Sequence, residues 1–331
     1  MTLCLRRREF IAGLGGAAAW PLVARAQQRA LPLIALIIGW ANSSKDYVAA
    51  FRKGLGEAGY VDGQNTTIEY LWLNGQYDAL PALMADLVRR RVTLIATPGV
   101  TDAAIAAKAA TATFPIPIVF GVADDPVKLG LVASLTRPGG NATGINFFAQ
   151  ELTAKRLGLL HELVPKATRI AVLVNPANAS STESTLRDAQ EAARVLGMQI
   201  VVLNASTVSE IDAGFAALAR EHADALLVAG DGFFNSRRVQ FATLAARDRV
   251  PTNYVLREHV EAGGLMSYGF NVELYREIGR YAGRILNGEK PADLPVLQPT
   301  KFELVINLKA AKAINLEIPL LVRALADEVI E

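Results

Sequence analysis

Residues 31–60, "LPLIALIIGWANSSKDYVAAFRKGLGEAGY", contain the pattern that decides the fold. The run 31–40 is aliphatic on both faces, which is typical of a parallel strand covered by helices on either side. After a short loop, Tyr47, Phe51 and Leu55 recur at helical spacing until a glycine near the end of the stretch. The stretch therefore predicts a buried strand, a loop and an amphipathic helix.

The same alternation continues through the first half of the chain. The elements expected next are a strand at 66–73, a helix at 77–90, a strand at 92–97, a helix at 101–112 and a strand at 117–122. Strands that alternate with helices in this order predict a parallel sheet with helices on both faces.

The second half repeats the pattern. Residues 169–204 parallel residues 32–74: each segment has an aliphatic strand, a loop with Asn and a Ser-Ser pair, a helix that ends near Gly, and another strand. Residues 224–255 parallel residues 92–120 in the same way. Two units repeated in one order predict an α/β fold with two doubly wound parallel-sheet lobes of similar build.

Open α/β sheets bind ligands beyond the carboxyl ends of their strands, so two facing lobes would enclose a cleft. Thr97 and Thr101 offer hydroxyls beside the free N–H groups of a helix start, which suits a carboxylate. Asp231 follows a strand and could pair with a ligand ammonium. Ordinary helix capping, by Thr101, by Ser180 or Ser181, and by Asp231, explains these residues about equally well, and the aromatic candidates could belong to the core. The residues expected at the cleft are Trp40, Ser43, Ser44, Thr97, Gly99, Thr101, Gly121, Val122, Asn175, Asn178, Ser181, Asp231, Tyr254 and Tyr268.

The N-terminus has the pattern of an export signal. Basic residues 6–8 precede a short apolar stretch, and an A-x-A cleavage pattern ends at Ala26. Arg7-Arg8 followed by Glu-Phe-Ile fits a twin-arginine signal, although general secretion stays open. We expect a periplasmic protein cleaved near Ala26, and no later stretch is apolar enough to span a membrane.

Removing residues 1–26 leaves 30 basic and 31 acidic residues and no cysteine. A net charge near −1 argues against nucleic-acid binding. A chain without cysteine needs neither disulfides nor a reducing compartment. The three histidines show no metal-ligand spacing, and no nucleophile motif or phosphate loop follows the signal. We expect no metal, no cofactor and no enzymatic activity.

Four longer segments carry a family resemblance: "FGVADDPVKLGLVASLTRPGGNATG" (120–144), "RIAVLVNP" (169–176), "AGGLMSYG" (262–269) and "YAGRILNGEKPADLPVLQPTKFELVINLKAAKAI" (281–314). With them the chain resembles the periplasmic substrate-binding proteins of ABC uptake transporters, in the family that includes tryptophan- and tyrosine-binding members. The resemblance implies a type I periplasmic-binding fold with three crossing segments, matched at 143–148, 266–270 and 299–304. The expected lobes are 27–145 with 270–300, and 146–269 with 301–331.

The resemblance implies an extracytoplasmic solute receptor that closes two lobes on a small carboxylate-bearing or amino-acid-like solute, with an aromatic body as one option. It would deliver this solute to a membrane permease served by a cytoplasmic ATPase, and a monomer suits that task. The identity of the ligand stays open. The alternative is a periplasmic ligand-sensing protein or enzyme on the same fold, for which the sequence shows no catalytic pair.

One adjacent acid pair remains. Asp124 and Asp125 end the apolar run before Pro126. Neighbouring residues of a helix do not share a face, and aspartate before proline is a common helix start. We therefore expect a helix beginning at Asp125 rather than a catalytic dyad.

Overall fold

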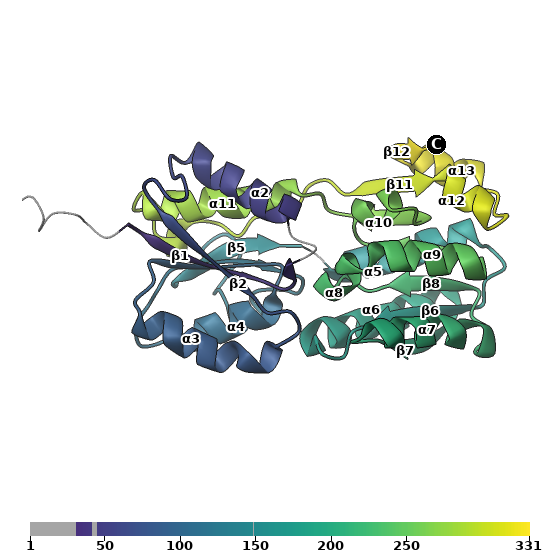
Figure 1. Cartoon of the computed structure of the whole chain (residues 1–331), viewed down its shortest axis with the longest axis horizontal. Coiled ribbons are helices and arrows are strands. Elements are labelled where there is room, and N and C mark those ends of the chain that lie inside the picture. The colour runs from purple at the N-terminus through teal and green to yellow at the C-terminus, as the bar shows by residue number, and fades with distance from the viewer. Residues whose placement is uncertain (1–30, 42–44, 148) are drawn as a thin grey trace, which may run out of the picture.

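The computed structural model describes residues 31–41, 45–147 and 149–331 (Figure 1). The protein has two lobes that lie side by side, and each lobe is built on one sheet. The predicted export signal lies outside the described residues. Within the described chain, no helix is long and apolar enough to cross a membrane.

The first lobe contains a parallel five-stranded sheet in the order β2-β1-β3-β4-β5. Its strands are β1 (Leu33–Ile38), β2 (Thr67–Trp72), β3 (Leu94–Pro98), β4 (Ile118–Val122) and β5 (Ala142–Asn146). Its helices are α2 (Lys45–Glu57), the 3-10 turn η2 (Tyr77–Ala79), α3 (Leu80–Arg89), α4 (Thr101–Ala110), α11 (Glu273–Leu286) and η3 (Pro291–Asp293).

Strand β1 shows why the sequence is aliphatic on both faces. Ala35 and Ile37 pack toward α3 and α4. The residues between and beside them, Ile34, Leu36 and Ile38, pack toward α2 and α11. Because successive side chains of a strand point to opposite faces, a strand covered on both sides needs apolar residues at every position.

The second lobe contains a seven-stranded sheet in the order β12-β11-β10-β9-β8-β6-β7. Its strands are β6 (Arg169–Val174), β7 (Gln199–Asn204), β8 (Ala225–Val228), β9 (Thr252–Tyr254), β10 (Met266–Gly269), β11 (Glu303–Asn307) and β12 (Glu328–Ile330). Its helices are α5 (Ala149–Leu163), α6 (Ala179–Leu196), α7 (Val208–Arg220), α8 (Gly232–Ser236), α9 (Arg238–Asp248), α10 (Arg257–Glu261), α12 (Leu308–Ala313) and α13 (Leu320–Leu325).

The two sheets share one strand order. Strands β7-β6-β8-β9-β10 of the second lobe are parallel and follow the same 2-1-3-4-5 arrangement as the first sheet. This confirms the predicted fold class, two doubly wound lobes of similar build. The second sheet has two further strands at its edge: β11 pairs antiparallel with β10, and β12 pairs parallel with β11.

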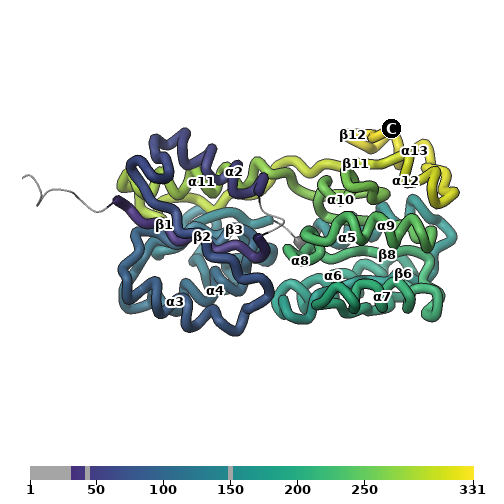
Figure 2. Tube along the Cα trace, in the orientation of Figure 1, coloured from purple at the N-terminus to yellow at the C-terminus, as the bar shows by residue number. Residues whose placement is uncertain are grey.

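The chain crosses between the lobes three times (Figure 2). It leaves the first lobe after β5, returns after β10 so that α11 packs on α2, and leaves again to form β11. The first two predicted crossings, 143–148 and 266–270, overlap β5 and β10, so the actual crossings begin a few residues later. A crossing is set by where a strand ends, which the sequence locates only approximately.

The prediction of a helix beginning at Asp125 is wrong. Residues 126–130 form turns, in which the Leu131 N–H donates to the Pro126 carbonyl at 2.9 Å. Asp125 still caps locally, because its Oδ1 accepts from the Val127 N–H at 2.9 Å. Asp124 points elsewhere and forms an ion pair with Arg187 of α6, at 3.6 Å. The two acids therefore have separate partners, as expected, but no helix follows them.

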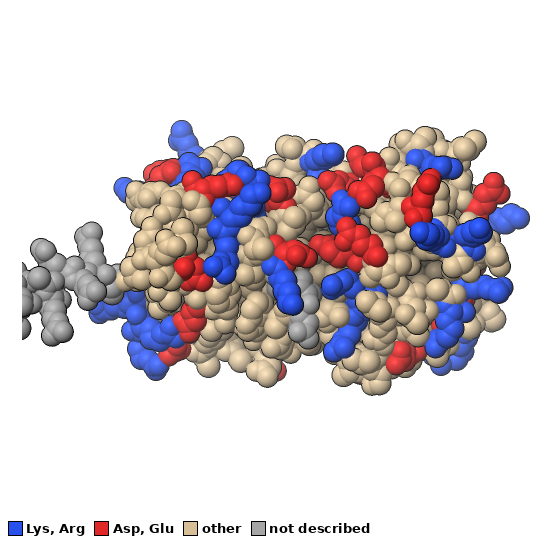
Figure 3. Space-filling model, turned by 45° about the horizontal axis from the view of Figure 1, so that its top comes forward, with Lys and Arg blue, Asp and Glu red and all other residues tan. Residues whose placement is uncertain are grey.

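Charged side chains of both signs are mixed on the face shown in Figure 3. On α2 and α11, for example, Glu57 forms ion pairs with Arg276 and Arg280. Such exposed pairs contribute little stability individually. This face has no field of a single sign of the kind that nucleic-acid binding uses.

Candidate ligand-binding cavity

A cavity of about 160 Å³ lies between the lobes, at the carboxyl ends of their parallel strands. The first lobe contributes residues that follow β1, β3, β4 and β5, together with side chains of α2 and α11. The second lobe contributes residues that follow β8 and β9, the start of α6, and part of α5. The strand order of both sheets therefore places this cavity where doubly wound folds bind ligands.

One wall is polar and centres on Asp231. This residue caps α8: its Oδ1 accepts from the Phe233 N–H at 2.8 Å and from Asn175 Nδ2 at 3.1 Å. Its Oδ2 accepts from Asn178 Nδ2 at 2.9 Å. Burial raises the pKa of Asp231, and the hydrogen bonds from the two amides oppose that rise. Asp231 keeps some accessible surface, as a residue that lines a cavity should.

A second charged residue on this wall is Arg156 of α5, which is only 1% exposed. Its Nε donates to Asn253 Oδ1 at 2.9 Å, and its Nη2 donates to the carbonyls of Val228 at 2.6 Å and Asn253 at 2.9 Å. Burial lowers the pKa of Arg156 to about 9, so the guanidinium still carries its charge at neutral pH.

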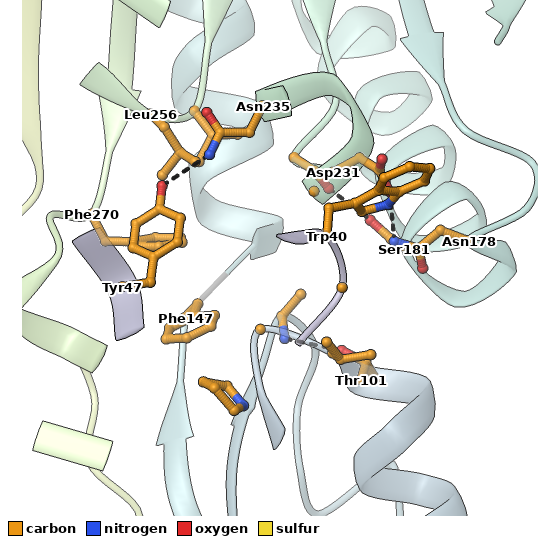
Figure 4. Close-up of a pocket in the computed structure, with 18 of the residues that line it drawn as sticks. Trp40, Tyr47, Thr101, Phe147, Asn178, Ser181, Asp231, Asn235, Leu256 and Phe270 are labelled. Atoms are coloured by element: carbon orange, nitrogen blue, oxygen red, sulfur yellow. Dashed lines mark hydrogen bonds between the residues drawn. The ribbon is translucent and has the colours of Figure 1, made fainter. Parts of the chain in front are cut away.

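The opposite wall is aromatic. Tyr47 stacks on Tyr275 with ring centroids 4.3 Å apart, and Phe147 stacks on Phe270 at 4.6 Å. Figure 4 shows Tyr47, Phe147 and Phe270 on one side of the pocket and Asp231 with Asn178 on the other. Trp40 lies beside Asp231 and packs on Phe233 at 5.1 Å. The cavity therefore has a polar end and an apolar end.

Two helices begin at the cavity. Helix α4 starts at Thr101 after Val100, and α6 starts at Ala179 after Asn178, and neither N-cap side chain bonds to its helix. Of the two alternatives that the sequence left open, ordinary capping by Thr101, and by Ser180 or Ser181, is therefore wrong at these two starts. The first-turn N–H groups and the positive ends of both helix dipoles favour negative charge.

Several contacts join the lobes around the cavity. The Tyr47 hydroxyl of α2 donates to Glu258 Oε1 of α10 at 3.2 Å and accepts from Asn235 Nδ2 of α8 at 3.3 Å. Burial raises the pKa values of Glu258 and of Asp124, which pairs with Arg187 across the lobes. These contacts can form only when the lobes are together.

The structure brings part of the predicted set into the cavity. The predicted residues that line it are Trp40, Gly99, Thr101, Asn178, Ser181 and Asp231. Ser43 and Ser44 lie outside the described residues. Asn175 lies behind the wall, where it holds Asp231.

The other five predicted residues lie outside the cavity. Thr97 and Val122 are fully buried within their strands. Gly121 has the Phe147 ring packed over it, 2.7 Å from where a Cβ would stand. Tyr254 stacks on His259 in the core at 4.5 Å, and Tyr268 packs beside Phe302. The cavity lies beyond the carboxyl ends of the strands, so at β4 and β9 the residues that line it are the ones after the strand, Ala123 and Val255.

The sequence reasoning missed most of the aromatic wall and Arg156. The missed lining residues with functional side chains are Tyr47, Tyr77, Phe147, Thr153, Arg156, Thr185, Asn235, Phe270 and Tyr275. Arg156 had a usable signal: it follows buried Leu152 by four residues and precedes buried Leu160 by four. A charged residue on the apolar stripe of a helix is unusual and indicates a buried polar role.

The comparisons with known proteins agree with this geometry. A sequence model of the family described as "ABC transporter substrate binding protein" matches residues 34–330. A tyrosine-binding protein of Clostridioides difficile (strain R20291) is 28% identical over 271 residues, which cover 81% of this chain and 76% of that protein.

Of two similar solved structures, one is a ligand complex and the other is ligand-free. The ABC domain from Streptococcus pneumonia in complex with L-Trp is 25% identical, covers 91% of this chain and 100% of its own, and superposes with a TM-score of 0.77. The ligand-free, open structure of a substrate binding protein with adhesive properties from Clostridium difficile is 27% identical, covers 90% and 98%, and has a TM-score of 0.61. At similar identity this chain superposes less well on the structure described as open. The contacts between its own lobes show that the two lobes lie together.

Proposed function

The chain belongs to the ABC transporter substrate binding protein family, and from this membership we propose that it is a receptor for an aromatic amino acid. It closes its two lobes on this solute and delivers it to a membrane permease. The observation that carries the ligand class is the cavity itself, which opposes the carboxylate of Asp231 to a wall of stacked aromatic rings.

The size of the cavity supports a ligand with one aromatic body. An engineered apolar cavity of about 150 Å³ binds benzene, and this cavity measures about 160 Å³. Aromatic rings favour stacked or tilted partners at centroid distances of about 4.5–7 Å, so the aromatic wall of the cavity suits a ligand ring packed against it. L-Trp and tyrosine, which the names of two relatives mention, are the first candidates.

The polar wall supports an amino acid rather than a hydrocarbon. Asp231 would accept from the ligand ammonium, and its geometry is held by Asn175 and Asn178. A buried charge needs a partner of opposite sign, because desolvation penalises it strongly. Family members are substrate-binding proteins, so we propose that this chain binds its solute without chemical conversion.

The cellular part of the proposal rests on the sequence. We propose export through the signal at 1–26, cleavage near Ala26 and a periplasmic, monomeric protein that meets a permease driven by a cytoplasmic ATPase. We propose the domain division that the sequence predicts, in which residues 27–145 and 270–300 form one lobe. Residues 146–269 and 301–331 form the other lobe.

Titration calorimetry of the mature protein tests the ligand class. We expect L-tryptophan or L-tyrosine to bind, and glycine, L-glutamate and ribose to bind far more weakly because none of them offers an aromatic ring. A bound ligand at 100 times its dissociation constant should also raise the free energy of unfolding by about 2.7 kcal/mol. Folded protein that binds neither aromatic amino acid would contradict the proposal.

A further inference from the structure

Trp40 belongs to the first lobe but packs against the second. It follows the end of β1 by two residues, yet its side chain packs against the hydrophobic core of the second lobe. The indole lies 5.1 Å from the Phe233 ring, centroid to centroid, and beside Asp231 (Figure 4). Trp40 also lines the cavity. This side chain therefore bridges the two lobes at the polar end of the cavity.

The indole meets the second lobe at a glycine, Gly232, which is the first residue of α8. A Cβ at this position would lie 2.8 Å from Cδ1, 3.6 Å from Cγ and 3.7 Å from Cβ of Trp40, and these are its three nearest atoms. Carbon atoms that are not bonded to each other pack at about 3.5–4.0 Å, so a side chain would collide with the indole. Gly232 does not have the positive φ that favours glycine. The close approach of Trp40 is therefore the constraint on this residue.

The first lobe holds Trp40 in a fixed position. On one side of it, the Gly39 carbonyl accepts from the Asn74 N–H at 2.8 Å. On the other side, the Ala41 N–H donates to Asn74 Oδ1 at 3.3 Å. Behind the indole, a Cβ on Gly75 would lie only 3.2 Å from Cζ2 of Trp40. The atoms that touch the second lobe belong to the root of this side chain, so rotation of the indole would not clear them. Separation of the lobes would.

We propose that the contact of Trp40 with the backbone of Gly232 determines how tightly the receptor holds its solute. Both are positioning residues: the indole of one lobe fits the place of a missing side chain on the other, and the fit exists only while the lobes are together. This inference rests on the proposed function, because closure adds to affinity only in a receptor that surrounds its ligand. A side chain at position 232 should favour the open form and leave the second lobe itself intact.

Gly232→Ala adds a single methyl group at this contact. We expect L-tryptophan and L-tyrosine to bind about tenfold more weakly in calorimetry, because the methyl overpacks the closed form. Denaturant unfolding of the empty variant should show no loss of stability, since alanine is the better helix former. Gly158→Ala is the matched control: it adds the same methyl to α5 of the same lobe, with nothing within 4 Å of its Cβ, and should not change affinity. Unchanged affinity in Gly232→Ala would overturn the inference.

A double-mutant cycle assigns this effect to Trp40. In a Trp40→Ala background, the methyl added by Gly232→Ala would meet only the Cβ at position 40, at the ordinary distance of 3.7 Å. Trp40→Ala alone should weaken binding, and adding Gly232→Ala to it should change affinity less than about twofold. If Gly232→Ala weakens binding by the same factor in both backgrounds, it acts on the cavity and not through Trp40. The inference then fails, while the proposed function stands. Wild-type protein that binds neither amino acid would contradict both.

A disulfide tests the contact directly, and decides if Trp40→Ala binds too weakly to measure. Residues 27–331 contain no cysteine, and the 3.7 Å between the two Cβ positions lies within the 3.5–4.5 Å of disulfides. Trp40→Cys combined with Gly232→Cys should therefore form a bond between the lobes. The oxidised protein should exchange labelled for unlabelled L-tryptophan at least roughly tenfold more slowly than the same protein after reduction. Each single cysteine variant should exchange at one rate in both conditions. Failure to form the disulfide, or equal exchange rates, would overturn the inference.

Discussion

At the scale of single residues, Asp231 combines a local and a functional role. The sequence left capping and ligand binding as alternatives, and the structure shows the cap, since Oδ1 accepts from the Phe233 N–H. The cap and the amides of Asn175 and Asn178 together use three of the carboxylate's acceptor positions, of which there are about four. An ammonium in the cavity would take the remaining position, so the two roles are compatible.

The affinity for an amino acid should depend on pH through Asp231. Burial raises its pKa above the ordinary 3.8 in the empty protein, whereas a bound ammonium favours the ionised form. We expect the affinity for L-tryptophan to be full at pH 7 and to fall on acidification through this raised pKa, by up to about tenfold per pH unit. The contribution of Asp231 to the stability of the empty protein should change with pH in the opposite direction. Because its pKa is raised on folding, this contribution is present below pH 3.8 and is lost as the pH rises through the raised pKa.

Calorimetry from pH 7 downward measures this dependence. Asp231→Asn should bind weakly, with a much flatter pH profile. The pH dependence of affinity that remains in this variant should come from the titration of Glu258 and Asp124, whose pKa values burial also raises. A wild-type profile that is flat down to pH 4 would rule out an ionised Asp231 as the ammonium partner.

At the scale of elements, the first lobe depends on a close crossing of α2 and α11. A Cβ on Gly54 would lie 1.9 Å from the carbonyl oxygen of Arg276, and a Cβ on Gly279 would lie 2.0 Å from that of Phe51. Backbone atoms in the middle of helices cannot move aside cheaply. These glycines therefore allow α2 and α11 to touch. This contact holds the segment that returns to the first lobe after the second crossing against the N-terminal part of that lobe.

The glycines of α2 provide a matched test of this crossing. Gly54→Ala should lower the free energy of unfolding by about 3 kcal/mol, because it overpacks the contact with α11. Gly56→Ala lies on the same helix with nothing within 4 Å of its Cβ, and should raise it by up to about 1 kcal/mol through helix propensity. Denaturant unfolding of both variants gives the comparison. Equal effects would mean that the helices are not in close contact.

At the scale of the whole molecule, closure brings together two lobes that each have their own hydrophobic core. The Tyr47 hydroxyl in the first lobe bonds Glu258 and Asn235 in the second. A receptor that opens loses such bonds, so they contribute to the closed form only. The apparent affinity of a ligand falls when the closed form is less populated, since only that form surrounds the ligand.

Tyr47→Phe tests the link between closure and affinity. Losing this hydroxyl should destabilise the closed form by about 1 kcal/mol, which corresponds to roughly fivefold weaker L-tryptophan binding, with little change in the stability of the empty protein. Tyr60→Phe is the control, because the Tyr60 hydroxyl bonds Asn287 within the first lobe, at 3.2 Å. Calorimetry and small-angle scattering measure affinity and compaction. If both variants lower affinity equally, Tyr47 does not act through closure.

Much of the architecture was predictable from the sequence. The strand at 31–40 became β1 (Leu33–Ile38), and the repeated unit at 169–204 became β6, α6 and β7. The turn at 126–130 was mispredicted, because an aspartate before a proline caps a turn as readily as a helix. The antiparallel pairing of β11 was not predicted either, since strand direction depends on where the chain returns rather than on side-chain pattern.

The sequence by itself determined the two doubly wound lobes and the end of each sheet at which a ligand would bind. These follow from periodicity and strand order, which are properties of consecutive residues. Only the tertiary structure decided which side chains form the cavity. Arg156, Asp231 and Tyr275 lie far apart in the chain and meet because three crossings fold the segments back between the lobes. The orientation of a side chain at a strand end changes with a shift of one residue, so the cavity could not be assigned until both sheets were in place.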